Sequence, residues 1–290
     1  MHDNIAVMKD SFWSFDEQGI LNHLWIVTER MDFTLADFFR HTAKKDYTPT
    51  PRLRDHRHLG AILVQTLQAL DYLHQRGIIH RNVKPENIGM SKKCHLKLFD
   101  FGVARSTNTD LTELVSTPLY HPLEVQLFEQ YDWGVDIWAT GLVALEFLNH
   151  SLYPANVNSK DKIKQRILDV LGVPEDKYKE FFKHKLKNEV QRDGCFDAFL
   201  TTAFERLEPG RRDLNEENLR DLLSKMLCIN PRRPLASELL EHEYLKMLQS
   251  AMTRKQIENS TNDQVTDHAK NQRDKETLIK ILKNFSRQLM

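Results

Sequence analysis

The chain has 290 residues, 40% of them hydrophobic, so it is long enough to bury a sizeable core in one large domain or two lobes. Lysine plus arginine and aspartate plus glutamate both number 41, and this balance gives no uniform field to attract nucleic acid or an anionic membrane. No apolar run is long enough to span a bilayer, and Met1 leads into polar residues. We therefore expect no nucleic-acid partner, no membrane partner, no transmembrane helix and no signal peptide.

The three cysteines are scattered along the chain as Cys94, Cys195 and Cys228, without the spacing of metal ligands. An odd number of scattered cysteines is typical of proteins from reducing compartments. We therefore expect a cytoplasmic or nuclear location.

The first 27 residues favour two short strands around a loop. Residues 5–8 and 24–27 are apolar and β-prone, and residues 16–19 between them are turn-prone. A helical pattern begins at His56, with leucine and isoleucine at spacings of three and four up to Leu73.

Short strands and further helices follow in the C-terminal part. Strands are predicted at residues 78–79 and 96–98, on either side of a polar loop. Helices are predicted at 134–149, 160–171, 215–228, 235–248 and 275–289. Residues 254–274 carry almost no large apolar side chain and are typical of a linker. A small β element and a largely helical body predict an α+β fold.

Two motifs carry most of the chemical information. The first is His80-Arg81-Asn82-Val83-Lys84-Pro85-Glu86-Asn87, between the long helix and the next strand, and the second is Asp100-Phe101-Gly102. Either motif alone is a weak signal. Together, in this order, they resemble the catalytic loop and the magnesium-binding motif of protein kinases.

Further matches follow downstream in the order of that family. Residues 117–124 resemble the end of an activation segment, and residues 135–141 resemble the start of the central buried helix. Arg233 lies where the family has the arginine that pairs with the activation-segment glutamate, here Glu124. The resemblance covers residues 2–248 and extends more weakly to the end.

Within the kinase family, the chain resembles MAP kinases. Residues 112–114 lie where MAP kinases carry Thr-x-Tyr, and residues 142–177 are similar to their helical insert region. Residues 26–32 and 222–227 are similar to the c-Jun N-terminal kinase branch.

The resemblance implies an α+β protein-kinase-like fold with an intact, mostly helical C-lobe and an N-lobe reduced to about two strands. The implied parts are an N-lobe and hinge remnant at 1–31, a C-lobe at 32–248, a linker at 249–274 and a C-terminal helix at 275–290.

ATP and magnesium are the cofactors that the resemblance implies. Thr28, Glu29 and Met31 would bind the nucleotide together with Asn87 and Asp100. The last two are hard oxygen donors that would also hold Mg²⁺, and Lys84 would stabilise the transferred phosphoryl group. Asp136 is expected to tie down the backbone of the catalytic loop rather than to catalyse.

Two departures from the kinase pattern argue against catalysis. Asn82 stands at the position of the catalytic base, and a neutral amide cannot accept a proton. Loss of general-base help typically costs about 10²–10⁴-fold in rate. The chain also contains no Gly-x-Gly-x-x-Gly motif. Lys9 is too close to Trp25 for the glutamate-bearing helix and strand that follow an ATP-binding lysine in kinases.

These observations support three hypotheses. The first is a pseudokinase that binds signalling proteins of a MAP kinase pathway. The second is an ATP-dependent serine/threonine kinase with an incomplete N-terminus, in which Asn82 is tolerated. The third is the relic of a gene that is not expressed. Upstream coding sequence with a glycine-rich loop and a lysine strand would favour the enzyme.

Regulation and recognition give three further expectations. A phosphate on Thr112 would meet Arg81, unless Thr112 is an ordinary loop residue. His121 replaces an arginine that helps MAP kinases to recognise proline after the phosphoacceptor, so we expect no preference for Ser-Pro or Thr-Pro. The apolar face of residues 275–290 would cover the two N-terminal strands, unless this helix is frayed or binds a partner.

Overall fold

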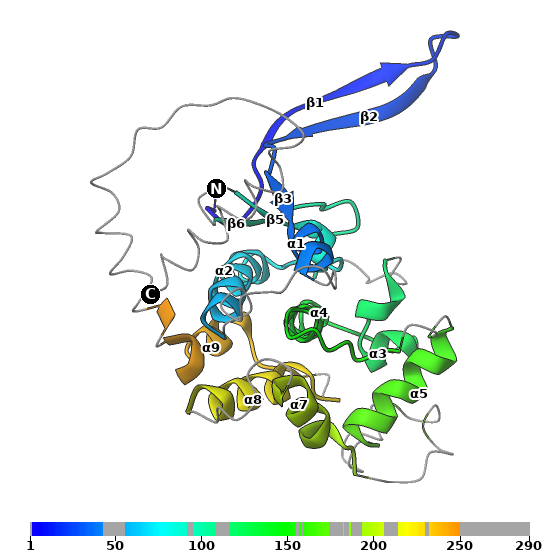
Figure 1. Ribbon diagram of the computed structural model, residues 1–290. Helices are drawn as coiled ribbons and strands as arrows, with labels where there is room; N and C mark the ends of the chain where they lie inside the picture. Colours follow the sequence, from blue (N-terminus) through cyan, green and yellow to red (C-terminus); the bar gives the residue numbers. More distant parts are fainter. Residues whose placement is uncertain are drawn as a thin grey trace, which may run out of the picture.

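In a computed structural model of the protein, the strands of the described residues lie between Met8 and Ser106, and helices predominate among the described residues that follow (Figure 1). The structure describes residues 2–42, 56–91, 95–107, 116–154, 157, 159–173, 182, 186, 193–205, 214–229, 232–246 and 248–249. The expectations for Cys94, Thr112, residues 250–274 of the linker and the helix at 275–290 lie outside these residues.

Three small sheets contain the strands of the described residues. The strands are β1 (Met8–Phe15), β2 (Leu21–Thr28), β3 (Phe33–Thr34), β4 (Ile78–Ile79), β5 (Ile88–Met90), β6 (Leu96–Leu98) and β7 (Arg105–Ser106). β1 pairs with β2, β5 lies between β3 and β6, and β4 pairs with β7. Every strand pair is antiparallel.

Helices make up the larger part of the body, which confirms the predicted α+β class. They are α1 (Leu35–Thr42), α2 (His56–His74), α3 (Leu123–Gln126), α4 (Gly134–Phe147), α5 (Lys160–Leu171), α7 (Phe196–Glu205), α8 (Leu214–Met226) and α9 (Ala236–Leu240), with short 3₁₀ helices η2 (Pro85–Asn87) and η3 (Pro118–Tyr120). None of the helices within the described ranges is long and apolar enough to cross a membrane.

The N-terminal hairpin confirms the predicted pair of strands and corrects their position. The first strand begins at Met8 rather than residue 5, because residues 4–6 bond elsewhere. The carbonyl of Asn4 accepts from the N–H of Leu98 at 2.8 Å, and the N–H of Ala6 donates to the Leu98 carbonyl at 2.9 Å. The turn is closed by Asp16, whose Oδ1 accepts the N–H groups of Gln18 and Ile20 at 2.9 and 2.8 Å.

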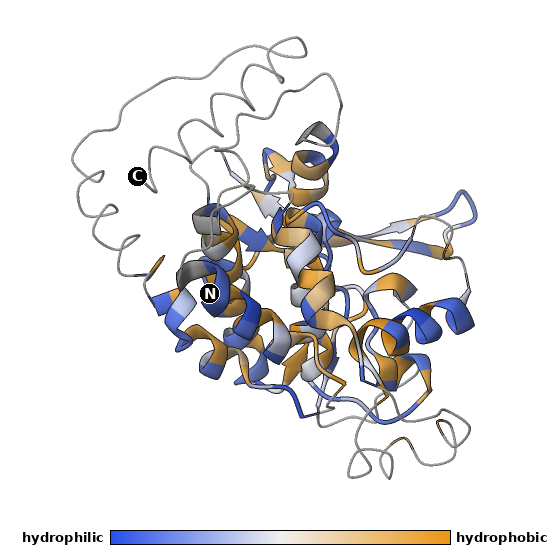
Figure 2. Cartoon of the chain, turned by 60° about the horizontal axis from the view of Figure 1, so that its bottom comes forward, coloured by the Kyte–Doolittle hydropathy of each residue, from blue (hydrophilic) through white to orange (hydrophobic). Residues whose placement is uncertain are grey.

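The core is built around α2 and α4. α2 is buried on nearly all sides from His58 to Leu67 and ends at His74; the turn after it is closed by Gly77, which has a φ of +66° that glycine tolerates best. α4 is apolar on nearly all sides and is buried on all of them, as expected of a central helix. Figure 2, coloured by hydropathy, shows that hydrophobic residues are concentrated in the helical body.

The helix predicted at 235–248 is interrupted in the structure. α9 ends at Leu240, where the N–H groups of Glu241 and His242 bond back three residues to Glu238 and Leu239. The ring of His242 then accepts the N–H of Tyr244 at 3.3 Å and starts a second turn. The His242 side chain therefore caps a new helical turn and divides a segment whose apolar spacing continues without a break.

A buried ion pair joins the loop before α9 to α3. Arg233 is 0% exposed and Glu124 is 2% exposed at the side chain, with 2.5 Å between Arg233 Nη1 and Glu124 Oε1. Arg233 Nη2 also donates to the Cys228 carbonyl at 3.0 Å. The predicted pairing of these two residues is confirmed.

We expect Arg233→Met to lower the free energy of unfolding by about 3–5 kcal/mol, because it leaves the Glu124 carboxylate buried without its partner. The double variant Glu124→Leu with Arg233→Met should recover most of that loss, since it removes both charges. Urea denaturation of the wild type and both variants measures the difference. Equal loss in the single and double variants would contradict this account.

Candidate functional site

The loop between β4 and η2 is held by a single buried carboxylate, that of Asp136 near the start of α4. Its Oδ2 accepts the N–H of His80 at 2.9 Å, and its Oδ1 accepts the N–H of Arg81 at 2.8 Å. The Oδ2 atom also lies 2.9 Å from His74 Nε2. The expected structural role of Asp136 is confirmed by these bonds.

The charge of Asp136 is stabilised by the groups that it binds. Burial alone would raise the pKa of this carboxyl, but the hydrogen bond and charge of His74, together with His80, outweigh burial and hold the pKa below its usual value. The N–H groups of His80 and Arg81 therefore donate to a carboxylate that keeps its negative charge. Arg81, with a φ of +66°, is kept in a backbone conformation that is unusual for a non-glycine residue.

Asn82, Asn87 and Asp100 come together beyond this anchor. Asn82 Nδ2 donates to Asp100 Oδ2 at 3.0 Å, and Asn87 Nδ2 lies 3.3 Å from the same oxygen. Asn87 Nδ2 also donates to the backbone carbonyl of Asn82 at 2.8 Å. Since a carboxylate only accepts hydrogen bonds, the amide nitrogen of Asn82 faces Asp100 and its oxygen points away.

This arrangement fits a magnesium ion only in part. With its nitrogen held by the Asn82 carbonyl, Asn87 keeps its amide oxygen as a ligand, and Asp100 is an exposed carboxylate. No group of three His, Cys, Asp or Glu side chains suited to a metal occurs in the described part of the chain. Asn87 and Asp100 would therefore hold Mg²⁺ with nucleotide phosphates and water as the other ligands, and the ion would neutralise phosphate charge.

Lys84 reaches the end of the segment before α3. Its Nζ donates to the Thr117 hydroxyl at 3.0 Å. The predicted phosphoryl-stabilising lysine thus has a hydroxyl partner contributed by a segment distant in sequence. The sequence motif contained Thr117 but gave no reason to join it to Lys84.

Thr28, Glu29 and Met31, which were predicted to bind the nucleotide, form the connection from β2 to the body. Glu29 Oε1 accepts from the N–H of Val7 and from Lys97 Nζ, both at 2.8 Å. Burial opposes this charge, yet the hydrogen bonds from Lys97 and Val7 keep the pKa of Glu29 below its usual value. Thr28, the last residue of β2, is exposed.

Met31 lies against β5, the strand that begins directly after Asn87. A Cβ atom placed on Gly89 would come within 2.4 Å of Met31 Cγ, so the glycine leaves room for this side chain. Met31 therefore packs beside this strand, whereas Glu29 is bonded to Lys97 of β6. The predicted nucleotide contacts of Thr28, Glu29 and Met31 stay predictions.

Arg81 is engaged on both sides of its guanidinium. Its Nε donates to the Val103 carbonyl at 2.7 Å, and its Nη1 donates to the Tyr131 hydroxyl at 2.6 Å. The side chain is buried. Because Thr112 lies outside the described residues, the expected contact of Arg81 with a phosphate there stays a prediction.

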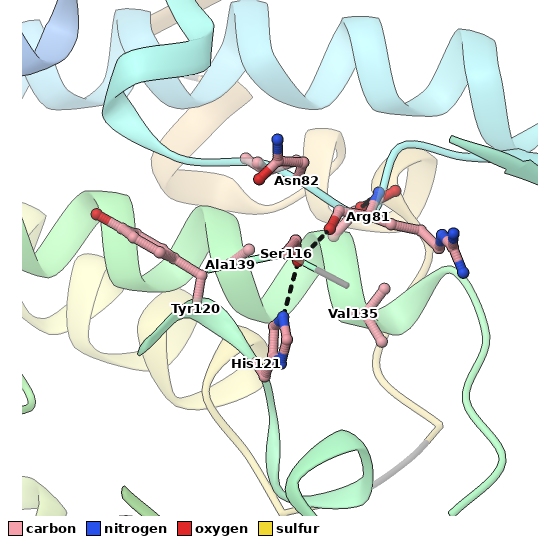
Figure 3. A pocket seen from close by; sticks show the side chains of 9 residues that line it. Arg81, Asn82, Ser116, Tyr120, His121, Val135 and Ala139 are labelled. Atoms are coloured by element: carbon pink, nitrogen blue, oxygen red, sulfur yellow. Dashed lines mark hydrogen bonds between the residues drawn. The ribbon is translucent and has the colours of Figure 1, made fainter. Parts of the chain in front are cut away.

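A small pocket lies beneath the catalytic loop (Figure 3). Ser116 Oγ donates to the Arg81 carbonyl at 3.0 Å and lies 2.7 Å from His121 Nε2. Because the hydroxyl proton is directed to that carbonyl, His121 Nε2 is the donor in the second bond. Figure 3 shows Asn82 pointing away from the Ser116–His121 pair.

His121 is uncharged at neutral pH. Burial, and secondarily the charge of Lys160, lower its pKa to about 4. A neutral imidazole here cannot replace the charge of an arginine. Neither the Ser116–His121 bond nor the Tyr131 contact was predicted from the sequence. Arg81 and Tyr131 are 50 residues apart, and the Ser116–His121 bond spans the η3 turn, which the sequence pattern did not predict.

The family described as "Protein kinase domain" matches residues 1–245. Mitogen-activated protein kinase pmk-1 of Caenorhabditis elegans is 32% identical over 255 residues, which cover 84% of this chain and 61% of that protein. Stress-activated protein kinase JNK of Drosophila melanogaster is 30% identical over 261 residues, covering 85% of this chain and 65% of that protein.

Mitogen-activated protein kinase p38a of Drosophila melanogaster is 32% identical over 255 residues, with 84% of this chain and 64% of that protein covered. The chain spans less than two thirds of the length of these relatives. The resemblance to MAP kinases, the c-Jun N-terminal kinase type among them, is thereby confirmed. The chain belongs to the protein kinase family and is similar within it to the MAP kinases.

Proposed function

We propose that this chain is a pseudokinase that binds signalling proteins of a MAP kinase pathway, in the cytoplasm or nucleus, without transferring phosphate to them. The observation that carries the proposal is the bond from Asn82 Nδ2 to Asp100 Oδ2. At the position where kinases place a proton acceptor, this chain directs a donor toward the metal-binding carboxylate.

The same bond bears on cofactor use. Kinases use ATP with Mg²⁺, which is held by the Asp of the Asp-Phe-Gly motif and by the Asn of the catalytic loop. Here the Asn82 amide donates to one oxygen of Asp100, the matching Asp, and so occupies an oxygen that the ion would need. Binding of ATP and magnesium is consequently weak in this proposal.

An active serine/threonine kinase is the second candidate, and the intact remainder of the loop favours it. Lys84 reaches Thr117, and Asn87 keeps the bond to the Asn82 carbonyl that leaves its oxygen available. Loss of the base alone leaves a slow enzyme, because general-base help contributes about 10²–10⁴-fold.

We expect no transfer of radiolabelled phosphate to protein substrates at millimolar ATP and Mg²⁺. The Asp100→Ala variant, prepared in the same way, is the control, because it lacks the carboxylate that would hold the metal. Activity in the wild type that disappears in this control would establish the second candidate instead. In that case Asn82→Asp should raise the rate.

Metal affinity separates the two candidates without an activity assay. Asn82→Asp would place a second carboxylate beside Asp100, and their repulsion is relieved by a divalent cation. We expect Mg²⁺ or Mn²⁺ to raise the melting temperature of this variant and to leave that of the wild type unchanged. An equal rise in both proteins would show that the amide does not impair the site.

Peptide recognition tests the consequence of the neutral His121. We expect peptides with Ser-Pro or Thr-Pro to bind no better than matched peptides with alanine after the acceptor, and no change between pH 6 and 8, because the pKa of His121 is about 4. Fluorescence anisotropy measures both comparisons. A clear requirement for proline would contradict the expectation, and His121→Arg should create one if charge is the missing feature.

A further inference from the structure

Thr117, directly before η3, is followed by a proline at the surface of the body. The sequence contains Thr-Pro pairs at residues 48–49, 50–51 and 117–118, and the last of them lies within the described residues. Thr117 is half-buried, whereas Pro118 and Leu119 are exposed. Proline-directed serine/threonine kinases recognise a proline after the acceptor, which has a fixed φ and no N–H to donate. The folded chain therefore presents an acceptor of this pattern.

Lys84 contacts the Thr117 hydroxyl and lacks a partner of opposite charge. Its Nζ donates to Thr117 Oγ1 at 3.0 Å. Within the described part of the chain, this is the one hydrogen bond of the Lys84 ammonium, and no carboxylate forms an ion pair with it. The side chain is half-buried, so its charge has lost water without gaining an anion. An anion added at the Thr117 oxygen would supply what is missing.

The segment around Thr117 is held by bonds that do not use its hydroxyl. Thr117 is the N-cap residue of η3, but its side chain makes no capping hydrogen bond. Its backbone carbonyl accepts the N–H of Tyr120 at 3.0 Å, and Gln126 Nε2 donates to the Pro118 carbonyl at 2.7 Å. A group added to the hydroxyl therefore leaves the bonds that hold this segment in place.

The acidic side chains close to this segment act on Tyr120. The Tyr120 hydroxyl donates to Glu146 Oε1 at 2.5 Å. Burial, and then the charges of Glu146 and Glu86, raise the pKa of Tyr120. Figure 3 shows the ring of Tyr120 pointing away from Ser116 and His121. The side chain in direct contact with the Thr117 hydroxyl is thus a cation, while the two carboxyl groups gather at the hydroxyl of Tyr120.

We propose that Thr117 is a phosphorylation site for a proline-directed serine/threonine kinase and that Lys84 holds the phosphate. In that kinase the Thr117 oxygen attacks the γ-phosphorus of ATP. The bond from this phosphorus to the β–γ bridging oxygen breaks, ADP leaves, and the hydroxyl proton passes to the kinase's general base. The bond from Lys84 to a neutral hydroxyl becomes an ion pair with a phosphate, which offers three strong acceptor oxygens and a charge of about −1.5 to −2 at pH 7.

The phosphate would occupy the lysine that stabilises a transferred phosphoryl group in kinases. Lys84 lies in the loop at residues 80–87, so the ion pair would fasten the segment at 116–120 to this loop and withdraw the ammonium from a nucleotide phosphate. The chain serves here as the acceptor of another kinase. The inference therefore does not depend on the proposed function, and it holds for both candidates.

Phosphate transfer to the full chain tests the site. An active proline-directed kinase with ATP and Mg²⁺ is incubated with the full chain and with a synthetic peptide of residues 111–123, and mass spectrometry locates the phosphate. We expect phosphate on Thr117 in both. Pro118→Ala should reduce it about tenfold, whereas Leu119→Ala, the matched control, keeps the Thr-Pro pair and should be modified like the wild type. A full chain unmodified at Thr117, or equal modification of Pro118→Ala and the wild type, would overturn the proposal.

Phosphorus NMR of the modified chain tests the role of Lys84. Thr48→Ala and Thr50→Ala are introduced so that Thr117 is the one remaining Thr-Pro acceptor. We expect the second pKa of the phosphate to lie about one unit below its value of about 6 in the urea-unfolded chain, because a nearby cation favours the doubly charged form.

Lys84→Met should abolish this shift of the phosphate pKa. Lys246→Met is the matched control, since it removes an exposed lysine that pairs with Glu241, and it should leave the shift intact. The same phosphate pKa in the folded and unfolded chains, or in Lys84→Met and its parent, would show that Lys84 does not hold the phosphate and would overturn that part of the proposal.

Discussion

The carboxylate of Asp136 is the interaction on which the site depends. It is fully buried in α4, and through two backbone hydrogen bonds it fixes the positions of His80 and Arg81. Arg81 then keeps a left-handed backbone conformation, which turns the chain so that Asn82 and Lys84 follow in their places. A buried charge without such donors would be costly, so the loop and α4 stabilise one another.

This anchor explains how the loop at residues 80–87 is held in one shape without help from the side chain of Asn82. Asp136 holds the preceding residue, Arg81, while the N–H of Asn82 donates to His80 Nδ1 at 3.3 Å and its carbonyl accepts from Asn87. None of these bonds uses the side chain of Asn82. Exchange of a carboxylate for an amide therefore leaves the conformation and changes only what the side chain can do, from accepting a proton to donating a hydrogen bond to Asp100.

The parts of the fold that sequence predicted well are those with strong local signals. α2 and α4 follow from apolar spacing, and the turn before β2 follows from Asp16 and Gly19. The predicted boundaries were wrong where hydrogen bonds outweigh the apolar pattern of the segment. Residues 5–7 are apolar enough for a strand, but the backbone there joins the edge of β6. Periodicity at 235–248 could not show that His242 starts a new turn.

For the site, the sequence predicted which residues come together but not which side chains bond to one another. Motifs gave the identities of Asn82, Asn87 and Asp100, and the structure brings these residues together. Motifs do not give the partners of side chains between segments, because those depend on the folded path of the chain. Glu29 is the instructive example, since its carboxylate is engaged by Val7 and Lys97. Its side chain thus fastens the hinge to the body.

The hairpin and the body on either side of Glu29 differ in how much apolar surface they bury. The body buries its apolar residues against one another, whereas the hairpin beyond Glu29 buries few of its own. Two strands with no covering layer are only marginally stable in water, and exposed apolar faces add no burial to oppose the loss of chain entropy. Among the described residues, the order of the hairpin therefore depends on the pairing of its two strands and on its attachment at Glu29. The body has a closed core of its own, so fraying of the hairpin would leave the loop at residues 80–87 in place.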